Sequence, residues 1–305
     1  MSLNKKFLQA DRVADRMTEA MIKKQLLPAY KESLTVIQGK LADLYRKYSA
    51  EGTLSLADVS RYNRLTTLEN DITAEMRRLG NRQVGYTKTT IKGVYTESYQ
   101  RAAFGLESEL QMKLRFGQLP TRQIEAAILN PLDRIGWPNR TREQITIATR
   151  QVKEAITQGI IQGKSYPAVA REVKERLDIS ATKAQRIVRT EAHRAREEGK
   201  LASLEHAAGQ GLNIKKRWVS AMDSRVRDEH GAADGQVVDM EEPFVVGGEE
   251  LEYPGDPAGS AENVINCRCT MIAEVPGYEP TERRTKEDDV IPYTNYTEYA
   301  EAKGW

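Results

Sequence analysis

The chain has 305 residues, of which 39% are hydrophobic and 30% are charged, and its formal net charge is +2. We expect neither a membrane-spanning nor a secreted protein, because no apolar run of about 18 residues occurs and the first residues lack the apolar centre of a signal peptide. Two cysteines are too few for a disulfide framework, so they favour a metal site or plain buried thiols.

The charge is unevenly distributed along the chain. Residues 220–289 hold 6 Lys/Arg and 18 Asp/Glu, whereas residues 1–219 carry a net charge of +15. A basic segment of this kind can bind nucleic acid or an acidic protein surface. It can equally be a set of solvated helix faces, and the sequence leaves both interpretations open.

Helical periodicity dominates the chain up to about residue 208. Apolar residues between Phe7 and Ile22 recur at helical spacing, and Pro28 predicts the end of that first helix. Gly80 follows two arginines and predicts the end of a later helix. The next helix carries four aromatic residues on a loosely shared side, which is typical of a core face: Tyr86, Tyr95, Tyr99 and Phe104.

A strong break interrupts the helices in the stretch NPLDRIGWPNRT. Two prolines and a glycine within eight residues are incompatible with a helix interior, so we place a domain boundary near residue 130. Further helices are predicted to follow, with Ser165 and Ser180 as N-caps of the last two.

Beyond residue 210 the pattern changes to short strands separated by turn residues, with Gly247 and Gly248 where a hairpin turn belongs. The predicted fold class is therefore a mainly α N-terminal helical domain plus a C-terminal α+β domain in which helices are followed by a small antiparallel sheet. We assign the helical domain to residues 1–130, the α+β domain to residues 131–275, and a C-terminal arm to residues 276–305.

Both cysteines lie in the stretch NVINCRCTMI, one residue apart. In a strand, Cys267 and Cys269 would point to the same face and toward one partner. His230 is the only histidine in the same region. If a helix begins at Asp223, then Asp223, Arg227 and His230 fall on one side of it.

This arrangement suggests a structural zinc site. Two thiolates supply half of a tetrahedral site, the histidine a third ligand, and a carboxylate the fourth. Candidates for that carboxylate are Asp223, Asp234 and Asp256. A lone Cys-x-Cys is only moderately diagnostic, so buried free thiols and a redox pair remain alternatives.

An enzymatic interpretation uses the charged residues near these positions. A metal-dependent nuclease could draw acid, base and anion-binding groups from Glu191, His193, Asp223, Arg225, Arg227 and His230. The chain has neither a phosphate-binding glycine loop nor a His-Glu-x-x-His helix, and a thiolate site suits such an enzyme poorly. We therefore interpret the following residues as a structural ion-pair network: Arg189, Glu191, Arg225 and Arg227.

Three stretches in this order resemble the phage head morphogenesis family, the Mu F-like minor head proteins. They are ITQGIIQGKSYPAVAREVKERLDISATKAQRIVRTEAHRA, RWVSAMDSRVRDEHGAADGQVV and YPGDPAGSAENVINCRC, and the resemblance spans residues 141–275. Its motif falls on Arg189, Thr190, Glu191, Trp218, Asp223, Arg225, Arg227, His230, Asp234, Gly235, Pro254, Asp256, Asn266, Cys267 and Cys269.

The resemblance implies a non-enzymatic component of a tailed-phage virion. Members of this family associate with the portal protein during capsid assembly and are thought to influence DNA packaging or genome ejection. We expect residues 1–130 to contact the portal, with the tyrosines near residues 86–99 as anchors. A basic helical body near the portal, inside the capsid, would also suit sequence-independent contacts with packaged double-stranded DNA.

Overall fold

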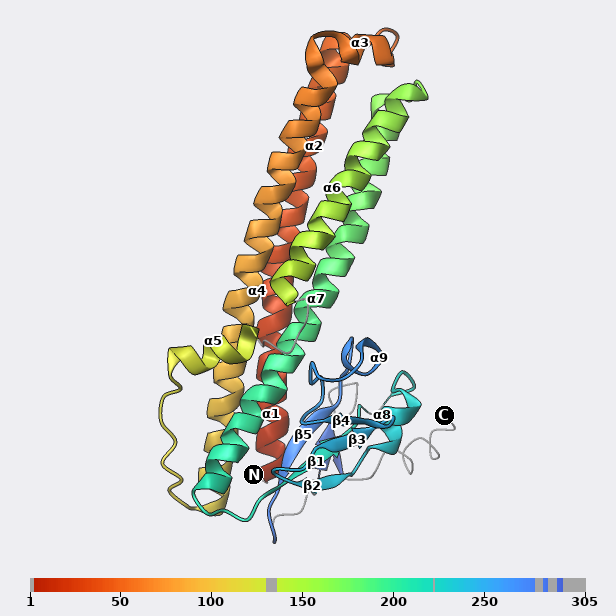
Figure 1. Ribbon diagram of the computed structural model, residues 1–305. Helices are drawn as coiled ribbons and strands as arrows, with labels where there is room; N and C mark the ends of the chain where they lie inside the picture. Colours follow the sequence, from red (N-terminus) through yellow and green to blue (C-terminus); the bar gives the residue numbers. More distant parts are fainter. Residues whose placement is uncertain (1–2, 130–135, 222, 278–281, 285–289, 293–305) are drawn as a thin grey trace. The chain divides into compact units, whose positions relative to one another are not determined.

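The computed structural model describes residues 3–129, 136–221, 223–277, 282–284 and 290–292. The chain forms two compact units, each assembled from separate stretches. We call Ala20–Thr87 with Ile135–Val188 the helical unit, and Met1–Glu19, Lys88–Arg134 and Arg189–Trp305 the sheet unit. This division differs from the expected consecutive domains 1–130, 131–275 and 276–305, because three long helices each continue from one unit into the other. They are α1 (Leu3–Met21), α4 (Arg64–Leu110) and α7 (Tyr166–Gly209) (Figure 1).

The helical unit is built from antiparallel pairs of long helices. Besides parts of α4 and α7, it contains η1 (Ile22–Leu26), α2 (Leu27–Tyr48), α3 (Leu56–Ser60), η2 (Arg61–Asn63) and α6 (Trp137–Ile161). In Figure 1 α2 runs beside α4, and Ser33 on α2 donates a 2.6 Å hydrogen bond to Glu75 on α4. One continuous apolar cluster fills the unit, from Met21 to Val188.

The sequence predicted that the first helix ends at Pro28, but the helix continues past this residue. The chain instead passes through the π-helical turn η1, in which the Leu27 N–H reaches the carbonyl oxygen of Ile22, and continues as α2 with the proline in its first turn. Leu26 and Leu27 both have helical backbone angles, so the helix has no free N-terminus here, and the widened turn accommodates a proline that cannot donate the next helical hydrogen bond. The widened turn therefore replaces the predicted break.

Gly80 and Ser180 lie inside helices rather than at their ends. A Cβ on Gly80 would lie 3.3 Å from Ile145, so the glycine allows α4 to approach α6 closely. Ser180 is buried, and its hydroxyl accepts a hydrogen bond from Gln144 at 2.5 Å. The predicted N-cap of Ser180 is thus wrong, because its hydroxyl bonds across to α6 and α7 runs on without interruption.

The sheet unit carries short strands after α7. They form a three-stranded antiparallel sheet in the order β2-β1-β5, a β3-β4 hairpin and a β6-β7 pair. Strands β1 to β5 are labelled in Figure 1. Their bounds are β1 (Lys215–Val219), β2 (Val237–Asp239), β3 (Phe244–Val246), β4 (Glu249–Leu251), β5 (Thr270–Glu274), β6 (Glu282–Arg284) and β7 (Val290–Pro292), with the short helices α5 (Thr121–Leu129), α8 (Asp228–Ala232) and α9 (Ala261–Val264). Gly247 and Gly248 both have positive φ and connect β3 to β4, which confirms the predicted hairpin.

A second apolar cluster fills the sheet unit around the fully buried Trp218. Tyr95 and Tyr99 are buried, as the core interpretation required. They therefore cannot be the surface anchors that we expected near residues 86–99. Phe104 differs from the prediction, since 64% of it is exposed.

The fold class is confirmed: long helices come first, followed by a small antiparallel sheet. The predicted break at residues 130–135 and most of the expected arm 276–305 lie outside the described residues. Among the helices that the structure describes, none is both long enough and apolar enough to cross a membrane.

Candidate metal centre

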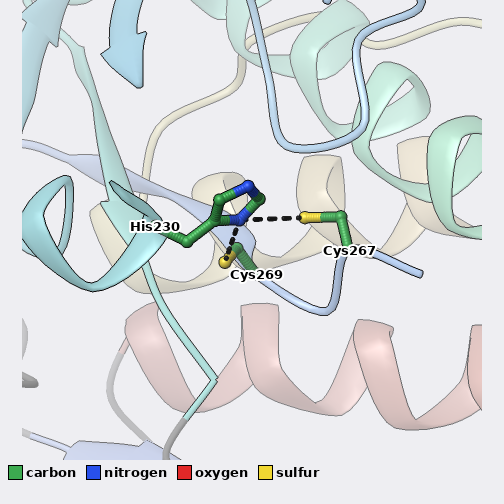
Figure 2. Close-up of side chains that lie close together, drawn as sticks. All are labelled: His230, Cys267 and Cys269. Carbon is green, nitrogen blue, oxygen red and sulfur yellow. Dashed lines mark hydrogen bonds between the residues drawn. The ribbon is translucent and has the colours of Figure 1, made fainter. Parts of the chain in front are cut away.

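His230, Cys267 and Cys269 come together in the sheet unit, as the sequence predicted. His230 lies on α8, and both cysteines lie in the segment that connects α9 to β5, just before the strand begins. Their ligand atoms all lie within 4.8 Å of one another, and all three side chains are buried. Figure 2 shows both sulfur atoms facing Nδ1 of the imidazole, with Cys269 Sγ at 3.3 Å and Cys267 Sγ at 3.7 Å.

These separations fit a tetrahedral zinc ion. Zinc binds nitrogen at about 2.0–2.1 Å and sulfur at about 2.3 Å, so its nitrogen and sulfur ligands lie about 3.5 Å apart. The two observed Nδ1–Sγ distances, 3.3 and 3.7 Å, lie on either side of that value. Three side chains are therefore placed to hold the metal with little rearrangement.

Asn263 fixes the orientation of the histidine ring, a role that the sequence reasoning missed. Its side-chain nitrogen donates to the carbonyl oxygen of Val246, so its oxygen faces His230 Nε2 at 3.2 Å. Because that oxygen can only accept, Nε2 carries the hydrogen and Nδ1 is left free to bind a metal or accept from a thiol. The only indication in the sequence was the position of Asn263, four residues before Cys267. No general spacing rule identifies an asparagine at this position as the partner of a histidine.

The two thiols have different acidities. The hydrogen bond with Cys269, together with burial, raises the pKa of the Cys267 thiol well above its usual range. Burial also acts to raise the pKa of Cys269, but its hydrogen bonds with Cys267 and His230 outweigh burial and lower that pKa. Cys269 is thus the more readily formed thiolate, which is the state that binds metal.

The three carboxylates considered as a fourth ligand are engaged elsewhere. Asp223 forms ion pairs with Arg268 and, at 3.3 Å, with Arg225. Asp234 accepts from the Ser220 N–H at 2.7 Å, and Asp256 accepts from two backbone N–H groups in its own turn. Within the described residues no carboxylate joins the histidine and the two cysteines.

The helix expected to begin at Asp223 is also shorter than predicted. Residues 223–226 form a turn in which the Asp223 side chain accepts from the Arg225 N–H at 2.9 Å. Helix α8 begins only at Asp228. Asp223 therefore acts as a turn and ion-pair residue, and it does not share a helix face with His230.

The remaining motif residues do not form one ion-pair network, contrary to our interpretation. Arg189 pairs with Glu19 at 2.7 Å, and Glu191 pairs with Arg194 at 3.2 Å. Arg227 donates to the carbonyl oxygen of Ile265. Trp218, by contrast, packs its ring edge-on against His230, with ring centroids 5.7 Å apart. These motif residues therefore make separate local contacts, each of which stabilises a different loop or helix.

A buried network of charged residues adjoins the centre, and the sequence reasoning did not find it. Lys200 is fully buried on α7 and forms ion pairs with Asp11 at 2.8 Å and Glu197 at 2.9 Å. Glu197 also accepts from the backbone N–H of Met271 on β5. Arg196 extends this network to the carbonyl oxygen of Cys269 at 3.4 Å.

The positive charges in this network lower the pKa values of two neighbouring groups, Asp11 and His193. Burial acts to raise the pKa of Asp11, but the charges of Lys200 and Arg196 outweigh burial and lower it to about 2. Burial, followed by the same two positive charges, lowers the pKa of His193 well below its usual value. Asp11 is therefore ionised and His193 neutral, and the side chains connect α1, α7 and β5 of the sheet unit.

Known proteins resemble this chain over most of its length. The model of the family described as "Phage Mu protein F like protein" matches residues 150–272. Minor head protein GP7 of Bacillus phage SPP1 is 31% identical over 290 residues, which cover 92% of each chain.

Two further relatives have a lower sequence identity, and the matches cover a smaller part of those proteins. A protein named NAD(+)–arginine ADP-ribosyltransferase EFV, from Enterococcus faecalis, is 29% identical over 90% of this chain, but the match spans only 56% of that protein. The uncharacterized protein YqbB of Bacillus subtilis is 24% identical over 51% of this chain and 53% of its own length. No solved structure matches the chain.

Proposed function

Because the chain belongs to the phage head morphogenesis family of Mu F-like minor head proteins, we propose that it binds the portal inside the capsid of a tailed phage. There it assists head assembly, DNA packaging or genome ejection. A structural role in the phage head follows from the family membership itself. The portal contact and the step that it assists are the parts proposed here.

One observation carries this proposal: the match to a minor head protein covers 92% of both chains. The match to the ADP-ribosyltransferase covers 56% of that protein. The near-complete match therefore favours a structural, non-enzymatic role. Cleavage of plasmid DNA by the purified full chain with zinc or magnesium would contradict this part of the proposal.

The portal contact is assigned to residues before 130, at the segment Leu56–Asn63. It carries two large exposed apolar side chains, Leu56, which is 48% exposed, and Tyr62, which is 84% exposed. Tyrosine is enriched among residues that dominate protein interfaces, because it buries a large area with little loss of side-chain freedom. This segment replaces the buried tyrosines 95 and 99 as the expected anchor.

Co-purification with the portal protein of the same phage tests the contact. The full chain should be captured by the portal, and the Leu56→Ala, Tyr62→Ala double variant should lose at least about tenfold in affinity, as expected for an interface anchor. Ile179→Ala, which truncates another exposed apolar side chain, is the matched control. If the unchanged chain does not bind the portal, the proposed role is wrong; if only the double variant binds normally, the anchor lies elsewhere.

We also infer that the Cys-His centre holds a structural zinc ion. Cys267 and Cys269 would bind it as thiolates and His230 through Nδ1, and the metal would cross-link α8 to the segment before β5. Such a cross-link would stabilise the sheet unit, because several of its strands span only three residues each. Small sheets with little core often depend on a metal for stability.

Elemental analysis of the purified chain tests the zinc. We expect one zinc per chain, its loss in Cys269→Ser, and a lower melting temperature in that variant. Asn263→Ala keeps all three ligands but should weaken zinc binding about 10–100-fold, because the ring loses its partner. Asn81→Ala, an exposed position on α4, should change neither. Absence of zinc together with unchanged melting of Cys269→Ser would mean that the cysteines are plain buried thiols.

A further inference from the structure

A cavity of about 370 Å³ lies directly beside the candidate metal centre. All three candidate ligands border it, and so do four arginines: Arg189, Arg225, Arg227 and Arg268. No aspartate or glutamate is among the described residues that line this cavity. Its size is within the range of about 300–1,000 Å³ typical of small-molecule sites.

The charges around the cavity leave an excess of positive charge. Asp223 pairs with both Arg225 and Arg268, and Glu19 pairs with Arg189. Arg227 donates to a backbone oxygen instead. Four guanidinium groups are thus balanced by two carboxylates in the described residues, which leaves a charge of about +2.

The arginines remain accessible to a ligand. The side chain of Arg225 is 65% exposed and that of Arg268 is 37% exposed. A guanidinium group presents several N–H donors in a plane and matches the oxygens of a phosphate. A zinc ion with two thiolates is electrically neutral, so it would not cancel the excess charge. The same metal would have three ligands from the described residues and one coordination position left.

We propose that this cavity binds a phosphate group, which pairs with Arg225, Arg227 and Arg268 and supplies the fourth ligand of the metal. The excess positive charge equals the negative charge of a phosphate dianion. A phosphate group also has more oxygen atoms than a carboxylate, so it can accept hydrogen bonds from several arginines at once. The ligation part rests on the zinc proposed above; the arginine part does not. The phosphate can belong to a small phosphate monoester, which is a dianion, or to the backbone of DNA, where each phosphodiester group carries one negative charge and two neighbouring groups match the excess.

Equilibrium dialysis of the zinc-loaded full chain against radiolabelled inorganic phosphate tests the proposal. We expect saturable binding of one phosphate per chain. Arg227→Gln and Arg225→Gln should each weaken binding at least about tenfold, as expected for loss of a charge-assisted hydrogen bond. Arg46→Gln, which removes an exposed charge in the helical unit, should change the affinity less than about twofold.

Zinc content measured on the same samples separates the two proposals. If the chain holds zinc but binds no phosphate, or if the pocket variants behave like Arg46→Gln, the phosphate site is wrong and the zinc stands. If it binds phosphate through the arginines without holding zinc, the metal is wrong and the phosphate site stands without its ligation part. Thermal melting of both pocket variants establishes that they are folded.

Competition identifies the source of the phosphate. Unlabelled glycerol phosphate should displace the label if the site takes a monoester. A short duplex without terminal phosphates should displace it if the site takes the DNA backbone. Displacement by either supports the proposal, whereas displacement by neither at a large excess would overturn it, because the cavity would then take inorganic phosphate as an adventitious ion only.

Discussion

Lys200 has no contact with solvent, and its ammonium group lies between the carboxylates of Asp11 and Glu197. Replacing it with methionine would leave two buried carboxylates without their main counter-charge. We expect Lys200→Met to lower the free energy of unfolding by about 3–5 kcal/mol, measured by urea denaturation. Lys174→Met, which breaks an exposed pair with Asp178, should cost less than about 1 kcal/mol. Equal effects in the two variants would show that the buried network does not stabilise the fold.

Glu198, also on α7, makes stability depend on pH. Burial of its carboxylate, only partly offset by the charge of Arg194, raises its pKa from 4.5 to about 7. The folded state therefore binds the proton more tightly than the unfolded state. The resulting stabilisation is complete below about pH 4.5 and is lost as the pH rises through 7.

Chemical denaturation at pH 5 and pH 8 measures this effect. Between these values, the unchanged chain should lose about 1–2 kcal/mol more stability than Glu198→Gln, a value reduced from the full shift because the side chain is partly exposed. Glu154→Gln, at an exposed position of the helical unit, should follow the unchanged chain. A Glu198→Gln variant with the same pH dependence as the unchanged chain would refute the assignment.

The sequence predicted the residues of the centre better than their surroundings. Cysteine and histidine are rare here, so proximity in the chain was enough to group Cys267, Cys269 and His230. Asn263 and Lys200 could not be found in the same way, because amides and lysines are common and usually solvated. The helix around Lys200 has charges on every side, so its pattern does not reveal which of them are buried.

Two glycines in long helices have opposite roles at the scale of elements. A Cβ on Gly199 of α7 would lie 2.4 Å from the backbone oxygen of Tyr95 on α4, so the helices of the sheet unit could not keep their spacing. Around the Cβ position of Gly85, in the middle of α4, no atom lies within 4 Å apart from its chain neighbours and the nearby backbone of the same helix.

The matched pair Gly199→Ala and Gly85→Ala tests this difference. Alanine favours a helix over glycine by about 1 kcal/mol. Gly85→Ala should therefore raise the free energy of unfolding by about 0.5–1 kcal/mol, whereas Gly199→Ala should lower it by about 1–3 kcal/mol through overpacking. Stabilisation by both substitutions would mean that α4 and α7 are not in close contact at Gly199.

Helix and strand positions were largely predictable, but their ends were not. Strands β1 to β5 lie beyond residue 210, where the change to short runs separated by turn residues predicted strands, because those signals are local. Pro28 and Ser180 misled the prediction because a widened turn and a side-chain contact from another helix decided the outcome. The same applies to Asp223, whose ion pair with Arg268 depends on residues 45 positions away.

At the scale of the molecule, charge separates by compact unit. The helical unit holds 21 Lys/Arg and 12 Asp/Glu, a net charge of +9, and the stretches of the sheet unit therefore carry −7. The expected basic body of residues 1–219 thus corresponds to a basic helical unit together with parts of an acidic one. This separation makes the helical unit the candidate for contact with DNA.

Binding of labelled duplex DNA by the full chain should be independent of sequence and should weaken steeply with salt. Each phosphate contact contributes about 0.9 to the slope of log affinity against log salt. Replacing Arg46, Arg150 and Lys174 of the helical unit with glutamine should reduce that slope and the affinity. The same change at Lys88, Arg101 and Lys215, which are exposed in the sheet unit, should have little effect. If the unchanged chain does not bind at low salt, the basic surface serves protein partners instead.

The interleaving of the two units fixes the order in which they can be completed during synthesis on the ribosome. Every residue of the helical unit has been made once Val188 is added. Asp11, by contrast, waits for Lys200 and for Thr270, 259 residues after it. The helical unit should therefore gain protection against amide exchange on nascent chains in which Val188 has left the ribosome but Thr270 has not yet been added. Simultaneous protection of both units would contradict this order. Until β5 has been synthesised, the side of α1 that carries Asp11 lacks its partner Thr270 and stays exposed. A chaperone or an assembling partner could bind there.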